Sequence, residues 1–227
     1  MCIRDRFADA LSEKFEIIAP VHPGFAGSPI PDHFDDLKDL IYLYLDLMDA
    51  LDLQDAVLMG FSMGGWTAAE LAVLSTARLS TLILVDAVVV KVGGRDDRDI
   101  VDVFATPQEE LAKLPWHDQL KAPDPLKMTE AQRQIMQANR VALGLYTWEP
   151  YMHNPKLPRW LHRIDVPTLV LWGESDGLVS PDYGRAYAGM IPSAEFAVIP
   201  EAGHAPQVEQ PDDFVKKVLS FASNGAV

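Results

Sequence analysis

The chain has 227 residues, of which 48% are hydrophobic and 23% are charged, and its formal net charge is −14. This length and balance are typical of one globular domain with a sizeable core. The negative charge argues against nucleic acid or an anionic membrane as a partner. No apolar run approaches the roughly 20 residues that a membrane-spanning helix needs.

Residue usage also limits the chemistry. The single cysteine, Cys2, excludes an internal disulfide and fits a reducing compartment, so we expect a cytoplasmic protein. The six histidines are dispersed without the spacing of a zinc site, and no glycine-rich phosphate loop is visible. We therefore expect no metal and no cofactor, and a small molecule as the binding partner; the oligomeric state is left open.

The first six residues, Met1 to Arg6, lack the apolar segment of a signal peptide. They resemble an adapter-derived stretch that recurs at the ends of metagenomic reading frames, and we expect them not to be native. The protein proper is then predicted to begin inside a helix that ends near residue 14.

Hydrophobic periodicity predicts the elements that follow. In chain order, they are a strand at 15–20, a helix at 35–51, a strand at 56–60, a helix at 65–75, strands at 79–87, 168–173 and 194–199, and a last helix opened by Pro211. This alternation favours a parallel sheet with right-handed crossovers. Between about Val90 and Arg163 the alternation stops, and helical pieces such as 129–145 mix with prolines and charge clusters.

The Gly60-Phe61-Ser62-Met63-Gly64 motif is the most informative segment, because it joins a predicted strand to a predicted helix. A serine on such a turn lies at the carboxyl end of its strand and beside the N-terminus of the helix. The glycines permit a strained turn and close backbone packing. The free N–H groups of the helix N-terminus favour developing negative charge. The context predicts that Ser62 is a nucleophile, with the backbone N–H of Met63 as an oxyanion donor.

A serine nucleophile needs a base and a group that orients the base. Asp176 follows the strand at 168–173, and His204 follows the strand at 194–199, so both belong to the carboxyl edge of the sheet. Asp86 also ends a strand and is a rival for the acid role, whereas Glu174 is a less favoured substitute. The order serine, acid, histidine is associated with the α/β-hydrolase fold.

With these motifs the chain resembles the α/β-hydrolase family, in particular its lidded, single-domain esterases and meta-cleavage-product (carbon–carbon bond) hydrolases. The matching segments span nearly the whole chain and are residues 17–28, 60–65, 169–176 and 202–204. The resemblance implies an α/β fold with a mostly parallel sheet, flanking helices and a helical lid. Its expected divisions are a core at 7–89, a lid at 90–163 and a second part of the core at 164–227.

In that family the lid covers the active site, so aromatic residues of the lid are candidates for the walls of a pocket. Trp116 and Trp148 are the candidates here, together with Phe61, which directly precedes Ser62 in the motif. Packing of the lid onto the sheet is nevertheless the more common role of such aromatics. His117 and His153 lie in the lid region and are more simply solvated side chains than substrate ligands.

The resemblance also implies a difference. The family's sheet has three strands before the one that matches 15–20, and the loop after the third carries a His-Gly-type motif with a second oxyanion donor. His22-Pro23-Gly24-Phe25 suggests that motif but follows the wrong strand. We therefore expect an N-terminally truncated chain that lacks these strands and is insoluble, molten or nearly inactive when expressed alone.

Three functions are consistent with the residues. The first is a serine hydrolase acting on a small ester, thioester or carbon–carbon diketone substrate. The second is a cofactor-free perhydrolase or haloperoxidase-like enzyme, which keeps the same Ser62, Asp176 and His204. The third is a binding protein on a hydrolase scaffold, which has no need of all three residues. The lid shape that selects the substrate is not predictable from the sequence.

Overall fold

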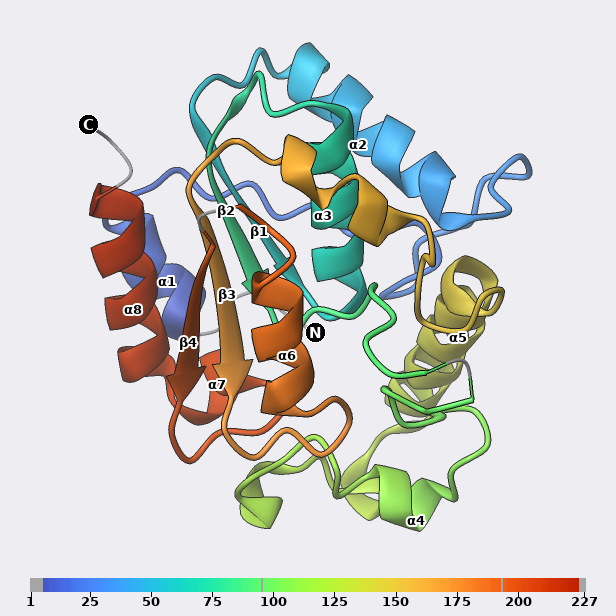
Figure 1. Cartoon of the computed structure of the whole chain (residues 1–227). Helices are drawn as coiled ribbons and strands as arrows, with labels where there is room; N and C mark the ends of the chain where they lie inside the picture. Colours follow the sequence, from blue (N-terminus) through green and yellow to red (C-terminus); the bar gives the residue numbers. More distant parts are fainter. Residues whose placement is uncertain (1–5, 95, 193, 225–227) are drawn as a thin grey trace.

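The computed structural model describes residues 6–94, 96–192 and 194–224, so most of the unusual first segment lies outside the described residues. A four-stranded parallel sheet forms its centre, in the order β1-β2-β3-β4 (Figure 1). The strands are β1 (Ala56–Phe61), β2 (Leu79–Val85), β3 (Thr168–Gly173) and β4 (Glu195–Ile199). The predicted α/β class and parallel sheet are confirmed.

Helices cover both faces of the sheet. One face carries α2 (Leu37–Ala50), α3 (Met63–Leu74) and α6 (Pro181–Ala188), and the other carries α1 (Arg6–Ser12) and α8 (Pro211–Asn224) (Figure 1). A short helix, α7 (Pro206–Glu209), precedes α8. The predicted helices at 35–51 and 65–75 are therefore present with ends displaced by one or two residues, and the last helix begins at Pro211 as predicted.

The central strands are buried on both faces, as their continuous apolar sequences require. In β2, Leu82 and Leu84 belong to the core beneath α2, α3 and α6, whereas Ile83 and Val85 belong to the core beneath α1 and α8. The side chains of β3 alternate between the two cores in the same way. The sheet therefore separates two hydrophobic cores and holds its own strands rigidly.

Local capping explains where two of the helices begin. Asp36 accepts a hydrogen bond from the backbone N–H of Lys38, and the Asp39 side chain returns a bond to the N-cap backbone of α2. Thr129 and Gln132 form the same reciprocal capping box at the start of α5 (Glu130–Thr147). Each box satisfies backbone donors that a helix leaves unpaired at its N-terminus.

The predicted strand at 15–20 is wrong. These residues are assigned no strand, and the side chains of Ile17 and Ile18 are 42% and 44% exposed. Among the described residues, β1 pairs only with β2, so no strand borders its other edge. An apolar, β-branched run becomes a strand only where a neighbouring backbone completes its hydrogen bonds, and no strand within the described ranges pairs with this run.

The irregular region lies between β2 and β3. It contains α4 (Gln108–Leu111), α5 and short 3₁₀ turns, η1 (Gln119–Lys121), η2 (Pro125–Lys127), η3 (Leu157–Arg159) and η4 (Leu161–Arg163). Figure 1 shows α4 beyond the carboxyl ends of β3 and β4, where a parallel sheet places its site. The division of the chain into core and lid stays a prediction.

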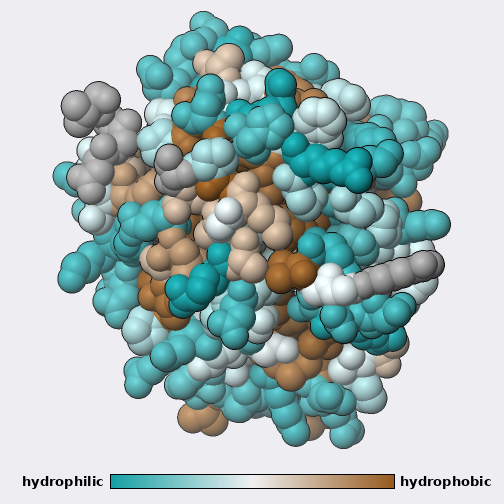
Figure 2. Space-filling view, viewed as in Figure 1, coloured by the Kyte–Doolittle hydropathy of each residue, from teal (hydrophilic) through white to brown (hydrophobic). Residues whose placement is uncertain are grey.

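The surface is mostly hydrophilic on the face seen in Figure 2, with a smaller apolar area near its centre. This agrees with the acidic composition of the chain. In the described part of the chain, no helix combines the length and apolar character that crossing a membrane requires.

Candidate active site

The carboxyl ends of the four strands bring the predicted residues to one edge of the sheet. Phe61 pairs with Val85, so the residues that follow them, Ser62 and Asp86, are neighbours just beyond β1 and β2. The backbone N–H of Ser62 donates to the carbonyl of Val85 at 2.9 Å, which continues the ladder past the strand. Asp176 and His204 follow β3 and β4 on the same edge.

Ser62 occupies a strained turn. Its backbone has φ 49° and ψ −117°, a left-handed conformation that costs about 1–3 kcal/mol in a residue with a side chain. The turn depends on small neighbours: a Cβ on Gly60 would lie 2.3 Å from the carbonyl oxygen of Gly64. A Cβ on Gly65 would lie equally close to the Cβ of Ala87. Close packing of the two glycines therefore makes the sharp strand-to-helix turn possible.

Directly after Ser62, α3 begins at Met63. The first N–H groups of a helix have no acceptor within the helix, and they carry the positive end of its dipole. The carbonyl of Ser62 accepts bonds from the N–H groups of Gly65 and Trp66, which fixes the first turn. The N–H of Met63 thus belongs to a fixed helix start beside the serine.

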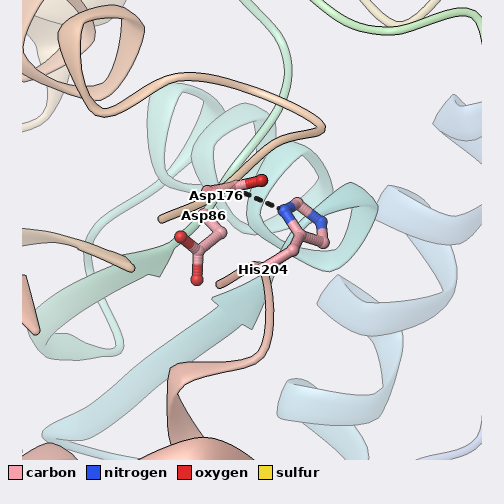
Figure 3. A group of neighbouring side chains, drawn as sticks. All are labelled: Asp86, Asp176 and His204. Atoms are coloured by element: carbon pink, nitrogen blue, oxygen red, sulfur yellow. Dashed lines mark hydrogen bonds and ion pairs between the residues drawn. The ribbon is translucent and has the colours of Figure 1, made fainter. Parts of the chain in front are cut away.

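His204 and Asp176 form a hydrogen-bonded pair. Nδ1 of His204 lies 2.7 Å from Oδ2 of Asp176, as Figure 3 shows by the dashed line. The Asp176 carboxylate is buried, and its other oxygen accepts bonds from the N–H groups of Leu178 and Val179 at 2.9 and 3.2 Å. These bonds fix the carboxylate, so it holds the imidazole in one orientation and one tautomer, with Nε2 left free.

In the described structure, no hydrogen bond joins the Ser62 hydroxyl to His204. Nucleophile and base contacts in unliganded sites are often longer than a hydrogen bond and shorten when substrate binds. The structure therefore places Ser62, Asp176 and His204 on one edge of the sheet and directly pairs only the last two.

The pKa of His204 is set by opposing effects. Burial lowers it, but the charge and hydrogen bond of Asp176, together with the charge of Asp86, raise it above the ordinary value of 6.5. The imidazole consequently keeps its proton to a higher pH than a free histidine does.

This shift predicts the pH dependence of the site. If His204 must be neutral to accept a proton from Ser62, the rate of Ser62 acylation should fall on the acid side with a midpoint above 6.5. A stopped-flow pH profile of acylation by an activated ester measures it. A profile that is flat from pH 6 to 8 would contradict the assignment of His204 as the base.

Asp86 lies next to this pair but makes a different contact. Its Oδ1 accepts a bond from the backbone N–H of Gly173 at 2.8 Å, and its Oδ2 is buried without a partner among the described residues. Burial, followed by the charge of Asp176, raises its pKa well above the ordinary value. Asp86, Asp176 and His204 each have a ligand-type atom within 4.8 Å of the others, and one atom each of Asp176 and His204 is engaged in the hydrogen bond between them.

The remaining candidates are placed as follows. The Phe61 ring packs against Phe7 and Phe214 in the second core, and Trp148 is 60% exposed in contact with Phe104 and Tyr151. Trp116 is half-buried, with its backbone close to Gly203.

The polar candidates make contacts outside the Asp176–His204 pair. Nδ1 of His117 shares a hydrogen bond of 2.8 Å with the Ser175 hydroxyl. Nδ1 of His153 contacts the carbonyl of Tyr151, and the exposed Glu174 accepts a hydrogen bond from the N–H of Glu201.

Two further features of this edge were not predicted, although His22 lies in a segment of the sequence that suggests a His-Gly-type motif. Nε2 of His22 lies 3.7 Å from where a Cβ on Gly64 would sit, and its Nδ1 shares a 2.5 Å hydrogen bond with the Tyr44 hydroxyl. Burial lowers the pKa of His22, which favours the neutral form of the ring beside the serine turn. The other feature is the buried carboxylate of Glu209, two residues before α8. The His22-Pro23-Gly24-Phe25 segment was the signal in the sequence for the first contact, whereas no spacing rule pointed to Glu209.

Comparison with known proteins agrees with this fold. The model of the alpha/beta hydrolase family matches residues 2–217. A meta-cleavage product hydrolase from Pseudomonas fluorescens IP01 has a similar structure, with a TM-score of 0.76 and 20% identity over 96% of this chain and 84% of that one. A 2-hydroxy-6-oxo-6-phenylhexa-2,4-dienoate hydrolase from Rhodococcus gives a TM-score of 0.72 and 21% identity, over 95% and 83% of the two chains.

Curated relatives are similar at the level of sequence. A 2-hydroxy-6-oxo-6-(2'-aminophenyl)hexa-2,4-dienoic acid hydrolase of Metapseudomonas resinovorans is 26% identical, over 95% of this chain and 77% of its own length. A dihydrolipoyllysine-residue acetyltransferase component of the acetoin cleaving system of Pseudomonas putida is 28% identical over 93% of this chain, which spans 57% of that relative. The family match covers nearly the whole chain, and so the chain belongs to the alpha/beta hydrolase family.

Proposed function

We propose that the chain is a serine hydrolase in which Ser62 is the nucleophile, His204 the general base and Asp176 the group that orients the base. The observation that carries this proposal is the fixed Asp176–His204 pair at the same sheet edge as the strained Ser62 turn. Strain at a residue with a side chain is typical of functional positions, and a histidine held by a buried carboxylate is suited to accept a proton.

The proposed reaction begins when the Ser62 oxygen attacks a substrate carbonyl and its proton passes to Nε2 of His204. The charge on the carbonyl oxygen would be stabilised by the N–H of Met63 at the start of α3. His204 then gives its proton to the leaving group, which leaves an acyl group on Ser62. Water, deprotonated by His204, attacks this acyl group and restores the serine.

For the substrate class we propose a small ester, thioester or carbon–carbon diketone. Relatives at 26–27% identity include hydrolases named for dienoate substrates and a poly(3-hydroxyalkanoate) depolymerase of Ectopseudomonas oleovorans. These names describe those proteins. They support the proposal that this chain acts on a carbonyl substrate, which Ser62 would attack. Ester and carbon–carbon substrates differ in the leaving group, which is an alkoxide in one and a carbanion equivalent in the other.

A substrate panel tests the proposal. The protein is purified both as this chain and with its upstream coding sequence added. Each form is assayed with p-nitrophenyl acetate, an acyl thioester and a vinylogous diketone, and separately for peracid formation from acetate and hydrogen peroxide. Hydrolysis of at least one carbonyl substrate that is lost on pretreatment with a fluorophosphonate is the expected result. Peracid formation without hydrolysis would favour the perhydrolase alternative, and no turnover together with no fluorophosphonate labelling would contradict the serine hydrolase.

A further inference from the structure

A buried carboxylate lies behind the histidine loop and is not used in the proposed reaction. Glu209 ends α7 and is 2% exposed. Its Oε2 accepts bonds from the backbone N–H groups of Gly203 at 2.6 Å and His117 at 3.1 Å, and its Oε1 accepts from that of Asp118 at 2.8 Å. One side chain therefore joins the residue before His204 to a segment more than eighty residues earlier in the chain.

The segment bound by Glu209 also contacts both site loops directly. The N–H of His204 donates to the carbonyl of Pro115 at 2.8 Å, and the N–H of Gly177 donates to the carbonyl of Leu114 at 3.0 Å. The packing there is close, because a Cβ on Gly203 would lie 2.3 Å from the Pro115 oxygen. Residues 114–118 are thus held between the loop that carries Asp176 and the loop that carries His204.

A hydrogen bond from the Lys121 side chain fixes the same arrangement. Nζ of Lys121 donates to the backbone carbonyl of Glu209 at 2.6 Å. His117, Asp118 and Lys121, which lie in the region between β2 and β3, are therefore all bound to Glu209 at the end of α7. This differs from a uniformly mobile lid: residues 114–121 belong to the fixed frame of the site.

We propose that Glu209 is a positioning residue for His204: by binding the Gly203 N–H and the 115–118 segment together, it holds the imidazole in contact with Asp176. The inference rests on the proposed role of His204 in proton transfer. Glu209 does not touch His204 itself, so its effect passes through the backbone on either side of the histidine. Displacement of a catalytic group by about 1 Å can cost on the order of 10²-fold in rate.

Two variants separate the contacts of Glu209. Glu209→Ala removes all three acceptor contacts. Glu209→Gln keeps the shape and one oxygen, which can still accept from Gly203 and His117, but its amide NH₂ faces the N–H of Asp118 and cannot accept from it. Glu201→Gln is the matched control, because it removes an exposed carboxylate from the same loop, three residues before His204.

The direct measurement is an NMR titration of the His204 ring, assigned with His204→Gln. The groups that face this ring are Asp176 and Asp86, and both raise its pKa. In Glu209→Ala, the looser Asp176 contact should shift the His204 titration to lower pH. In Glu209→Gln the shift should be smaller, and Glu201→Gln should titrate like the unmodified protein. A merely structural role would lower the melting temperature without moving the titration of the folded protein.

The kinetic measurement is the limiting rate of Ser62 labelling by a fluorophosphonate, below the melting transition of each variant. We expect a decrease on the order of 10²-fold in Glu209→Ala, with little change in the concentration that gives half the limiting rate. Should Glu209→Ala not fold, Glu209→Gln decides, and an unshifted His204 titration in a folded variant overturns the proposal. If the unmodified protein is not labelled, the proposed function fails, whereas the titration still tests Glu209.

Discussion

Replacing Ser62 with alanine is expected to abolish covalent labelling by a fluorophosphonate and to reduce ester turnover on the order of 10⁶-fold. In the proposed reaction the serine oxygen forms the bond to substrate, and no neighbouring group would replace it. Alanine is small enough for the turn, and the variant should unfold at nearly the same temperature as the unmodified protein. Intact-mass spectrometry of the treated protein measures the label directly.

The structure supplies a demanding control for this substitution. Ser175 is a second serine near this edge, and its hydroxyl lies 2.8 Å from Nδ1 of His117. Ser175→Ala should keep full labelling. Label that persists in Ser62→Ala and disappears in Ser175→Ala would transfer the nucleophile to the Ser175–His117 pair.

Asp176→Asn should lower turnover on the order of 10⁴-fold with little loss of stability. The asparagine oxygen can still accept from Leu178 and Val179. Its NH₂ would then face Nδ1 of His204 and donate to it, which places the imidazole proton on Nε2. That nitrogen could no longer accept the proton of Ser62.

Asp86→Asn is the comparison that decides the acid. Asp86 bonds the N–H of Gly173 rather than His204, and an asparagine keeps that acceptor. Turnover should therefore fall less than tenfold, a modest effect compared with loss of the group that orients the base. Steady-state kinetics of both variants at the pH of maximal rate make the measurement. If Asp86→Asn were the inactive variant and Asp176→Asn the active one, the acid role would belong to Asp86.

The elements that carry the site were predictable because each has a local signal. Gly60 and Gly64 indicate the turn at Ser62, and an apolar strand directly precedes both Ser62 and Asp86. The order of Ser62, Asp176 and His204 along the chain then predicted one shared edge, since parallel strands end on the same side. These predictions needed only short stretches of sequence and the rule of strand direction.

What sequence reasoning missed depends on contacts between distant residues. Ile17 and Ile18 have the composition of a strand, but a strand exists only beside a partner, and composition does not reveal the partner. Glu209 resembles an ordinary surface acid next to a helix start, and only the fold shows its carboxylate enclosed by N–H groups from residues 117, 118 and 203. The secondary-structure preference of each residue could be read from the sequence, whereas the distant residues that it contacts could not.

The close approach of Gly65 and Ala87 limits how this protein can vary. Because a Cβ on Gly65 would lie 2.3 Å from that of Ala87, neither position can gain volume unless the other segment moves away. Ala87 is fully buried and follows Asp86, and the next residue, Val88, donates its N–H to the carbonyl of Ser62 at 3.4 Å. In directed evolution, the turn after β1 and the turn after β2 would therefore have to be changed together. Libraries that diversify one turn alone would mostly contain variants in which Ser62 is displaced. Variants that keep the site intact would have to be sought in the irregular region between β2 and β3.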